Sequence, residues 1–437
     1  LRGRFRSDLE GFADKNLIVA KPELLEIGYE IAGDRIEDAI YADSKVERQK
    51  KVGALRDEVE AAIKERHPEA TDFDVEQVFE YIQKKAFRIS IMEKNKRADG
   101  RELKQLRPLT AEINCLPSVV HGSALFARGE TMAMALATLA PLEERQYFDS
   151  YTGGEDTKRF ILHYNFPPFS VGDTGRFGGQ NRREIGHGAL AERSIAPVIP
   201  ADADFPYAIR VSSEVMESNG STSMATVCAG TMSLLAAGVP LIRPVAGISV
   251  GLVTEFNGDQ MERYVTLLDI IGSEDFYGDM DFKVTGTKDG ITATQMDIKV
   301  DGLSYEVLAA ALEQARKGRM HILGKLTECI AEPREDYKPC VPRIVQIVIP
   351  QDMIGPVIGP GGKVIQDIQK TTNTTITITE VDNKGIVDIF GIDKEALDGA
   401  LARIKAIVAI PEVGETYHGK VRSIVAFGAF VEIAPGV

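Results

Sequence analysis

The chain has 437 residues, of which 44% are hydrophobic, so it can form ordinary folded cores in about two to four domains. Its formal net charge of −14 provides no overall positive field for nucleic acid, so any polyanion must be held by local basic groups or by metal. It has no long apolar run and no signal peptide, which argues against a membrane protein.

The cysteines give no sign of a metal site. There are four, scattered along the chain without the spacing of metal ligands: Cys115, Cys228, Cys329 and Cys340. Scattered cysteines are typical of reduced thiols, so we expect a cytoplasmic protein. The chain starts at Leu1 and stops at Val437 inside a strand-like pattern, and we therefore expect a fragment of a longer protein.

Residues 1–95 are predicted to form an all-helical domain. Apolar residues recur at helical spacing over 23–32, 35–66 and 74–93. Pro68 would end the second of these helices, and Asp72 or Asp74 would cap the third. Because the segment is heavily charged and holds no catalytic-looking cluster, we expect a spacer or docking domain.

The composition changes at the charged, glycine-containing linker 96–101, and residues 96–332 are predicted to form an α+β core. Two helices are predicted in it, over 223–237 and 304–330. The predicted strands are 113–115, 123–127, 132–139, 159–165, 207–214, 247–254, 264–271, 282–287 and 290–300.

The acidic stretch 269–284, with five acids and one lysine between two apolar runs, is the main candidate for a catalytic site. Asp281 and Lys283 are two residues apart, so on a strand they would point to the same face. Asp275 precedes a glycine-containing turn and could fold back beside them. Two carboxylates with a few waters suit Mg²⁺, and a lysine can neutralise a leaving oxygen. The alternative is a solvated acidic turn.

Residues 217–224 form a hydroxyl-rich turn that runs into a predicted helix. Free backbone N–H groups, the helix dipole and the side-chain hydroxyls could together bind an anion there. The alternative is an ordinary helix cap. The glycine-lysine signature of a Walker loop is missing.

Two further clusters could contact a phosphorylated ligand. Arg182 and Arg183 can clamp phosphates, and His187, between two glycines, is expected on a turn within reach of a ligand. Surface ion pairs with Glu184 or Glu192 are the alternative. Residues 166–169, with Tyr164 just before them, form a rigid aromatic turn that could stack on a base, although core packing is the favoured explanation.

Residues 340–411 are predicted to form a KH domain, with the element order β-α-α-β-β-α and a glycine-rich loop between its first two helices. Such a loop lets backbone amides approach nucleic-acid phosphates. Its predicted RNA-binding residues are Gly359, Pro360, Gly361, Gly362 and Lys363.

Residues 412–437 look like the start of a ribosomal-type OB-fold, with strands expected over 414–421 and 424–431. Only the first strands of such a fold are present, so this truncated OB-fold cannot bury a core by itself. It would be disordered or packed on a neighbour.

Four stretches together resemble one family: 163–168 (HYNFPP), 182–188 (RREIGHG), 217–221 (ESNGS) and 278–283 (GDMDFK). Their order and spacing resemble the second RNase PH-like core domain of polynucleotide phosphorylases. The resemblance covers essentially the whole chain and implies a ribosomal-protein-like β-α-β fold. The helical segment is similar to the family's linker between its two core domains.

The resemblance also implies roles for particular residues. It makes Asp275, Asp281 and Lys283 the catalytic group, with Mg²⁺, replaceable by Mn²⁺, on the two aspartates. The attacking phosphate would be held by Ser221, Thr222 and Ser223, and position 222 is often serine in relatives. The positions at the phosphate and the RNA 3′ end are matched by Arg182, Arg183 and His187.

The function implied is 3′→5′ degradation of single-stranded RNA by phosphorolysis to nucleoside diphosphates, reversible as template-independent polymerisation. Relatives form homotrimeric rings and join RNA-degrading assemblies. The family's first core domain has no counterpart here, which leaves ring assembly in question. Two alternatives remain: an RNase PH-type enzyme that trims tRNA 3′ ends, and a non-catalytic RNA-binding ring subunit.

Overall fold

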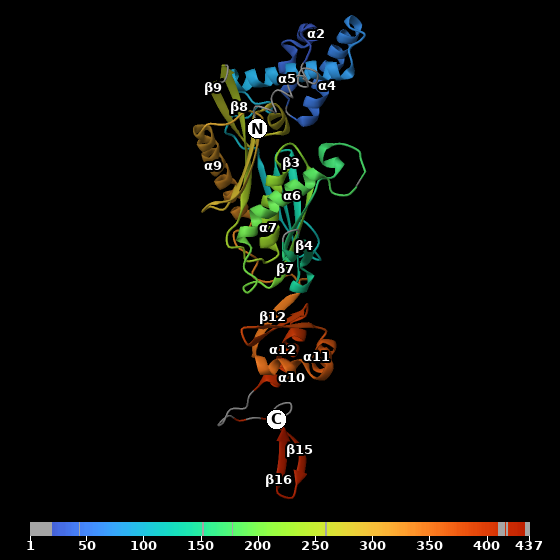
Figure 1. The fold of residues 1–437 in the computed structure, drawn as a ribbon, viewed down its shortest axis with the longest axis vertical. Coiled ribbons are helices and arrows are strands. Elements are labelled where there is room, and N and C mark those ends of the chain that lie inside the picture. The colour runs from blue at the N-terminus through green and yellow to red at the C-terminus, as the bar shows by residue number, and fades with distance from the viewer. Residues whose placement is uncertain are drawn as a thin grey trace.

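The computed structural model describes residues 20–42, 44–150, 153–176, 178–257, 260–409, 416 and 418–432. A helical region, a mixed core, a small α+β unit and a terminal hairpin follow one another along the long axis (Figure 1). In this part of the chain, no helix combines the length and apolar character needed to cross a lipid bilayer.

The helical region packs around its own apolar core, which includes Val59, Ile63 and Ile82. Its helices are α2 Pro22–Ala32, α3 Arg35–Ile40, α4 Lys45–Arg66 and α5 Asp72–Lys94. A second apolar cluster joins the end of α5 to the core, where Phe87 and Ile91 pack with Leu267. The region is therefore docked on the core rather than tethered to it.

Two predictions for this region are wrong in detail. The single helix expected over 35–66 is two helices, because Ser44 caps a new one by accepting a hydrogen bond from the Glu47 N–H at 3.2 Å. The cap of α5 is Thr71, and Asp74 completes a capping box with it.

The core is built on two large sheets. The first has the order β1-β2-β3-β7-β6, and the second has the order β11-β10-β8-β9. Strands of the first sheet are β1 Leu109–Ile113, β2 Gly122–Arg128, β3 Thr131–Pro141, β6 Phe160–Asn165 and β7 Tyr207–Glu217. Strands of the second are β8 Ala246–Asn257, β9 Gln260–Leu268, β10 Met280–Gly286 and β11 Ile291–Ile298.

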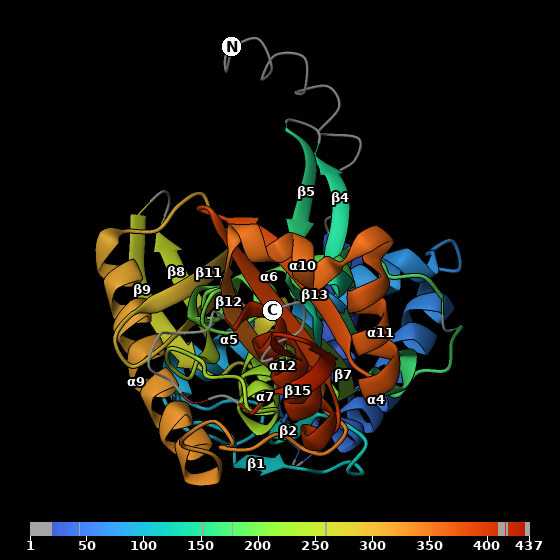
Figure 2. The same ribbon diagram turned by 90° about the horizontal axis from the view of Figure 1, so that it is seen from below.

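Three long helices pack on these sheets. Every residue of α7 Thr222–Ala236 is buried, because the helix is apolar or small all round and packs on β2, β3 and β8. Helix α6 Arg182–Ile195 packs on α7 and links β6 to its parallel neighbour β7, which makes the expected β-α-β unit. Helix α9 Tyr305–Cys329 lies along β8 and β9 (Figure 2).

Some core elements differ from the predictions. The strand expected over 113–115 ends at Ile113, because Asn114 takes a left-handed conformation with φ 58°. The turn expected before residue 280 contains a short helix, α8 Gly272–Tyr277. A hairpin of β4 Gln146–Ser150 and β5 Gly154–Lys158 was not predicted, and it projects from the side of the molecule (Figure 2).

The predicted KH domain has the expected element order. Its sheet is β12-β14-β13, and an apolar core that includes Ile349, Ile368 and Ile404 lies between sheet and helices. The elements are β12 Arg343–Pro350, α10 Ile354–Ile358, α11 Lys363–Thr372, β13 Thr375–Val381, β14 Lys384–Gly391 and α12 Lys394–Val408.

The last described elements form an exposed hairpin of β15 Lys420–Val425 and β16 Gly428–Glu432. Its turn lies at Ala426 and Phe427, so the strand boundary expected at 421–424 is wrong. Residues 414, 415 and 417, expected at the start of the first strand, lie outside the described residues. Whether this hairpin belongs to an OB-fold stays a prediction.

Candidate active site

One cavity of about 600 Å³ gathers most of the predicted site residues. It lies where α6, α8 and β10 meet the start of α7, and the first two turns of α4 line it as well. The predicted residues on its wall are Arg183, His187, Ser221, Thr222, Asp275, Asp281 and Lys283. Of the residues predicted to bind phosphate or the RNA 3′ end, Arg182 and Ser223 are not on the wall.

Strand β10 carries Asp281 and Lys283, which were predicted to share one face of a strand. The Lys283 ammonium lies 2.8 Å from the Asp281 Oδ2 atom, and both side chains are almost fully buried. Burial raises the pKa of Asp281, Lys283 opposes that rise, and Asp275 adds to it. The Asp281 Oδ1 atom is buried with no hydrogen-bond partner, so this carboxylate has an oxygen available to a ligand.

Helix α8 brings Asp275 to the same cavity, as expected from the sequence, although by a helical turn rather than a loop. Lys299, just beyond β11, donates to the Asp275 carbonyl oxygen and lies 4.0 Å from its carboxylate. Asp275 remains about half exposed, so its carboxylate is open to solvent and to a ligand.

The 218–222 loop presents the beginning of α7 to the cavity. Gly220 has φ 95° and Ser221 has φ 51°, so two successive left-handed residues turn the chain into the helix. The first N–H groups of a helix have no partner within it and carry the positive end of its dipole. The loop therefore offers backbone donors suited to an anion.

The hydroxyl groups around this loop differ in their surroundings. Thr222 and Tyr164 share a hydrogen bond of 2.6 Å between their hydroxyl oxygens. The Ser221 and Ser223 hydroxyls are buried without partners, and Ser223 is fully buried behind the cavity wall. Ser221 and Thr222 are thus the hydroxyl-bearing side chains of this group that line the cavity.

His187 lies on α6, so its predicted placement on a turn is wrong. The helix begins earlier because Asn181 and Glu184 form a capping box. The His187 Nδ1 atom lies 3.3 Å from the Tyr164 hydroxyl. Burial, followed by the charges of Lys283 and Arg183, lowers the pKa of His187 to about 4, so the ring is neutral near pH 7.

The two predicted arginines separate on α6. Arg183 faces the cavity, and its guanidinium carbon lies 4.9 Å from the centre of the Phe166 ring. Arg182 is exposed at the first position of the helix. In the predicted aromatic turn, Tyr164 is buried and stacks on Phe166, so this turn mainly supports the site from behind.

Three family models match the chain in order. They are "Polyribonucleotide nucleotidyltransferase, RNA binding domain" over residues 23–102, "3' exoribonuclease family, domain 1" over 105–240, and "KH domain" over 344–406. A protein of Akkermansia muciniphila named polyribonucleotide nucleotidyltransferase is 70% identical over 422 residues, which is 96% of this chain. The chain belongs to the polyribonucleotide nucleotidyltransferase family.

Other members of the family are more distant and align over similar lengths. The protein of that name from Bacteroides fragilis is 52% identical over 90% of this chain, and that from Cytophaga hutchinsonii is 49% identical over 92%. The chain spans 58%, 54% and 57% of the lengths of the Akkermansia, Bacteroides and Cytophaga proteins.

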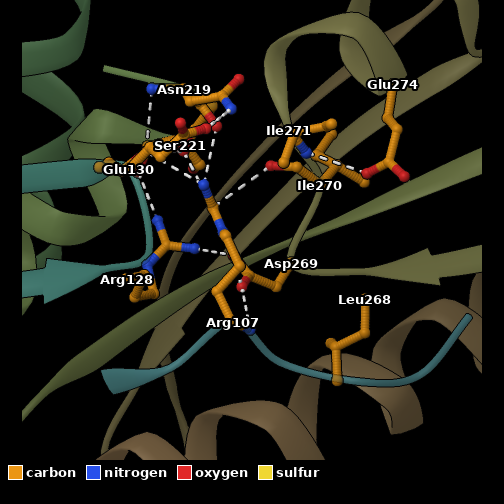
Figure 3. Close-up of polar contacts among 12 residues, drawn as sticks. Arg107, Arg128, Glu130, Asn219, Ser221, Leu268, Asp269, Ile270, Ile271 and Glu274 are labelled. Atoms are coloured by element: carbon orange, nitrogen blue, oxygen red, sulfur yellow. Dashed lines mark hydrogen bonds and ion pairs between the residues drawn. The ribbon is translucent and has the colours of Figure 1, made fainter. Parts of the chain in front are cut away.

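A buried ionic network that the sequence did not reveal lies behind the 218–222 loop (Figure 3). Asp269 is fully buried, and its carboxylate accepts from Arg101, Arg107 and Arg128. Burial alone would raise the pKa of Asp269, but Arg128 and Arg107 outweigh it and lower that pKa well below the usual range. The carboxylate is therefore held ionised inside the core.

Two of these arginines, Arg107 and Arg128, hold the 218–222 loop in place through hydrogen bonds to its backbone carbonyl groups. Arg107 donates to the Asn219 carbonyl at 2.7 Å, and Arg128 donates to the Ser221 carbonyl at 2.7 Å (Figure 3). The Thr131 hydroxyl donates to the Gly220 carbonyl at 3.1 Å. With these carbonyls held from behind, the opposite side of the loop faces the cavity.

The stretch predicted as a charged linker also belongs to this network. Arg97 is fully buried and pairs with Glu274 of α8 at 2.5 and 2.7 Å. It also donates to the Leu268 and Asp269 carbonyls. The linker thus anchors the helix that carries Asp275.

The predicted KH loop, 359–362, lies in a separate unit. Its three glycines all have positive φ, of 71°, 62° and 76°, and a Cβ on Gly359 would lie 2.2 Å from a Val364 methyl carbon. Gly361 has open space around it, and Gly362 leads into Lys363 at the start of α11. Their roles in RNA binding, and that of Pro360, remain predictions.

Proposed function

We propose that this chain carries the catalytic core of a 3′→5′ exoribonuclease that degrades single-stranded RNA by phosphorolysis and releases nucleoside diphosphates. The observation that carries the proposal is one cavity that joins an anion-binding helix start, an arginine and the Asp281–Lys283 pair. Phosphoryl transfer depends on positioning and charge stabilisation, and these groups supply both.

Inorganic phosphate would bind at the start of α7, against the backbone N–H groups and the Ser221 and Thr222 hydroxyls. Ser223 would contribute through its backbone, because its side chain lies behind the wall. Arg183 adds a guanidinium suited to phosphate oxygens, and neutral His187 can share a hydrogen bond with the RNA 3′ end. Arg182 would contact RNA outside the cavity.

Asp275 and Asp281 suit a divalent cation that keeps much of its own water. The unpartnered Asp281 Oδ1 atom is a free oxygen ligand, of the kind that Mg²⁺ and Mn²⁺ prefer. In the described residues, no group of three or more His, Cys, Asp or Glu side chains could hold a metal, so water and RNA would complete the shell. When bound, the ion offsets charge on the transferring phosphoryl group.

In the reaction, a phosphate oxygen forms a bond to the terminal phosphorus of the RNA, and the bond from that phosphorus to O3′ breaks. The proton of the phosphate ends on O3′, and the last nucleotide leaves as its diphosphate. Lys283 would stabilise the departing O3′ with its positive charge, and its burial beside Asp281 on the cavity wall supports this role. Microscopic reversibility gives template-independent polymerisation from nucleoside diphosphates.

We extend the proposal to the setting of the enzyme. The KH match supports capture of single-stranded RNA by the 359–363 loop. The family's ring form and its RNA-degrading assemblies are proposed for the full-length protein, as is a cytoplasmic location, which the four free cysteines support.

The test is incubation of the full-length protein with single-stranded RNA and Mg²⁺, with and without inorganic phosphate, followed by identification of the products. Nucleoside diphosphates that appear only with phosphate support phosphorolysis. Monophosphates formed without phosphate would indicate a hydrolase, and binding without products would indicate a scaffold; either result overturns the proposal.

Matched variants test the site. Asp281→Asn should abolish product formation and keep RNA binding, whereas Asp289→Asn, on an exposed turn of the same sheet, should leave both unchanged. Equal loss of activity and RNA binding in Asp281→Asn would contradict the assignment of Asp281 to the reaction.

A further inference from the structure

The helical region reaches into the active-site cavity, which its sequence did not predict. Three residues of the first two turns of α4 line the cavity: Lys45, Arg48 and Gln49. Arg48 is held within its own region, because its guanidinium donates to the Ile40 and Ala42 carbonyls. Lys45 instead points to the catalytic core.

Lys45 contacts the core through both its backbone and its side chain. Its ammonium donates to the Ser218 carbonyl at 3.0 Å, and its backbone N–H donates to the Glu130 Oε1 atom at 2.9 Å. Glu130 lies in the tight turn between β2 and β3. Ser44, which caps α4, fixes the direction of this first turn.

These contacts continue into the loop proposed to bind phosphate. The Glu130 Oε2 atom accepts from the Asn219 side chain at 2.8 Å, and the Asn219 Oδ1 atom accepts from the Gly272 N–H at 3.3 Å. Figure 3 shows Glu130 and Asn219 beside Ser221. A continuous set of hydrogen bonds thus runs from α4, through the loop, to the helix that carries Asp275.

Lys45 also adds charge to the phosphate end of the cavity. An ammonium has three donors, and the Ser218 carbonyl takes one of them. The side chain is part-buried on the cavity wall, where a positive charge is screened less than on an open surface. A purely structural tether between two regions would not need to lie on that wall.

We propose that Lys45 is a positioning residue of the active site, which holds the 218–222 loop and favours binding of inorganic phosphate beside it. This inference rests on the proposed function, because phosphate is the ligand assigned to that loop. It makes the helical region a part of the catalytic site, and not only a spacer between domains.

The experiment compares Lys45→Met with Lys50→Met in the full-length protein. Lys50 lies on the same helix, is exposed and does not line the cavity, so its replacement removes the same charge without the contact. For Lys45→Met, we expect the KM for phosphate to rise about tenfold with kcat changed much less. Lys50→Met should match the wild type, and Lys45→Arg should restore most of the affinity.

A binding measurement keeps the test independent of turnover. Phosphate that binds only the folded protein stabilises it by an amount set by the ratio of phosphate concentration to Kd. With a Kd about tenfold higher, Lys45→Met should need about ten times more phosphate for the same rise in melting temperature. A lower melting temperature with unchanged phosphate dependence would show a structural tether and overturn the inference. So would a Lys45→Met variant that matches Lys50→Met in both assays.

The outcomes also separate this inference from the proposed function. If the wild type forms nucleoside diphosphates and Asp281→Asn does not, the function stands whatever Lys45→Met does. Suppose instead that the wild type forms no diphosphates, but phosphate raises its melting temperature and this rise is lost in Lys45→Met. The role of Lys45 in phosphate binding then stands, and the proposed phosphorolysis is wrong. Absence of any phosphate effect on the wild type overturns the inference.

Discussion

Replacement of Asp269 by asparagine should lower the stability of the core more than any other single Asp→Asn change near it. The carboxylate is fully buried and compensates Arg101, Arg107 and Arg128. Asparagine has nearly the same shape, so packing is kept and the charge alone is lost. Arg107 and Arg128 then share a buried site without this counter-charge, and Arg101 keeps only its ion pair with Asp99.

The expected cost follows from the burial of the pair. Removal of one partner from a buried ion pair costs about 3–5 kcal/mol, because the remaining charge stays desolvated. For a domain of this size, about 1 kcal/mol corresponds to about 2–4 °C in melting temperature. Asp269→Asn should therefore lower the melting temperature of the core by about 6–20 °C.

Differential scanning calorimetry of the full-length protein measures this change. The control is Asp289→Asn, because Asp289 pairs with Arg243 at 3.3 Å on the surface, where both side chains are more than half exposed. Since Asp269 has a lowered pKa, its contribution is present above the unfolded pKa of about 4 and is lost as pH falls below that. The difference between the two variants should thus persist from pH 5 to 8.

If Asp269→Asn and Asp289→Asn had the same melting temperature, this reasoning would be refuted, since the buried arginines would then need no counter-charge. A difference that disappears between pH 7 and pH 5 would also refute it, because a carboxylate with a lowered pKa stays ionised throughout that range.

Three further predictions concern single residues. His187 should titrate with a pKa near 4 by NMR, and Lys283→Met should raise the pKa of His187 because a neighbouring positive charge is removed. The neutral His187 ring contributes stability that is lost as pH falls from about 6.5 toward 4. A titration midpoint near 6.5 would contradict the burial of His187. Gly361→Asp should weaken binding of long RNA in a gel-shift assay and spare turnover of short RNA, because it places a negative charge in the KH loop. Unchanged binding of long RNA would show that this loop does not contact RNA. Gly220→Ala should cost about 1–3 kcal/mol in calorimetry, because the new Cβ would lie 2.5 Å from the Ile270 carbonyl oxygen at a φ of 95°; an unchanged melting temperature would contradict this close approach.

The parts of the fold that depend on near neighbours were predictable from the sequence. Asp281 and Lys283 share a face because strand side chains alternate, and this follows from their spacing alone. The element order of the KH domain follows from local periodicity and glycine positions in the same way. The resemblance to the family added residue roles that spacing could not supply.

The failures involve competing local signals and long-range contacts. Two glycines beside His187 suggested a turn, but the Asn181 capping box and the packing of α6 on α7 favour a helix. Arg107, Arg128 and Asp269 are up to 162 positions apart in the sequence and meet only because β2, the 218–222 loop and the end of β9 come together in the fold. No periodicity or motif marks such a meeting point.

The buried Arg97 has a consequence for how the protein can be divided. The sequence changes character after residue 95, and a cut at residue 105, where the exoribonuclease family match begins, would keep every predicted catalytic residue. Such a cut would discard Arg97 and leave Glu274 as a buried charge without its partner, one residue before Asp275. The apparent border between domains therefore lies inside a single cooperative folding unit, and the core should fold only with its preceding segment attached.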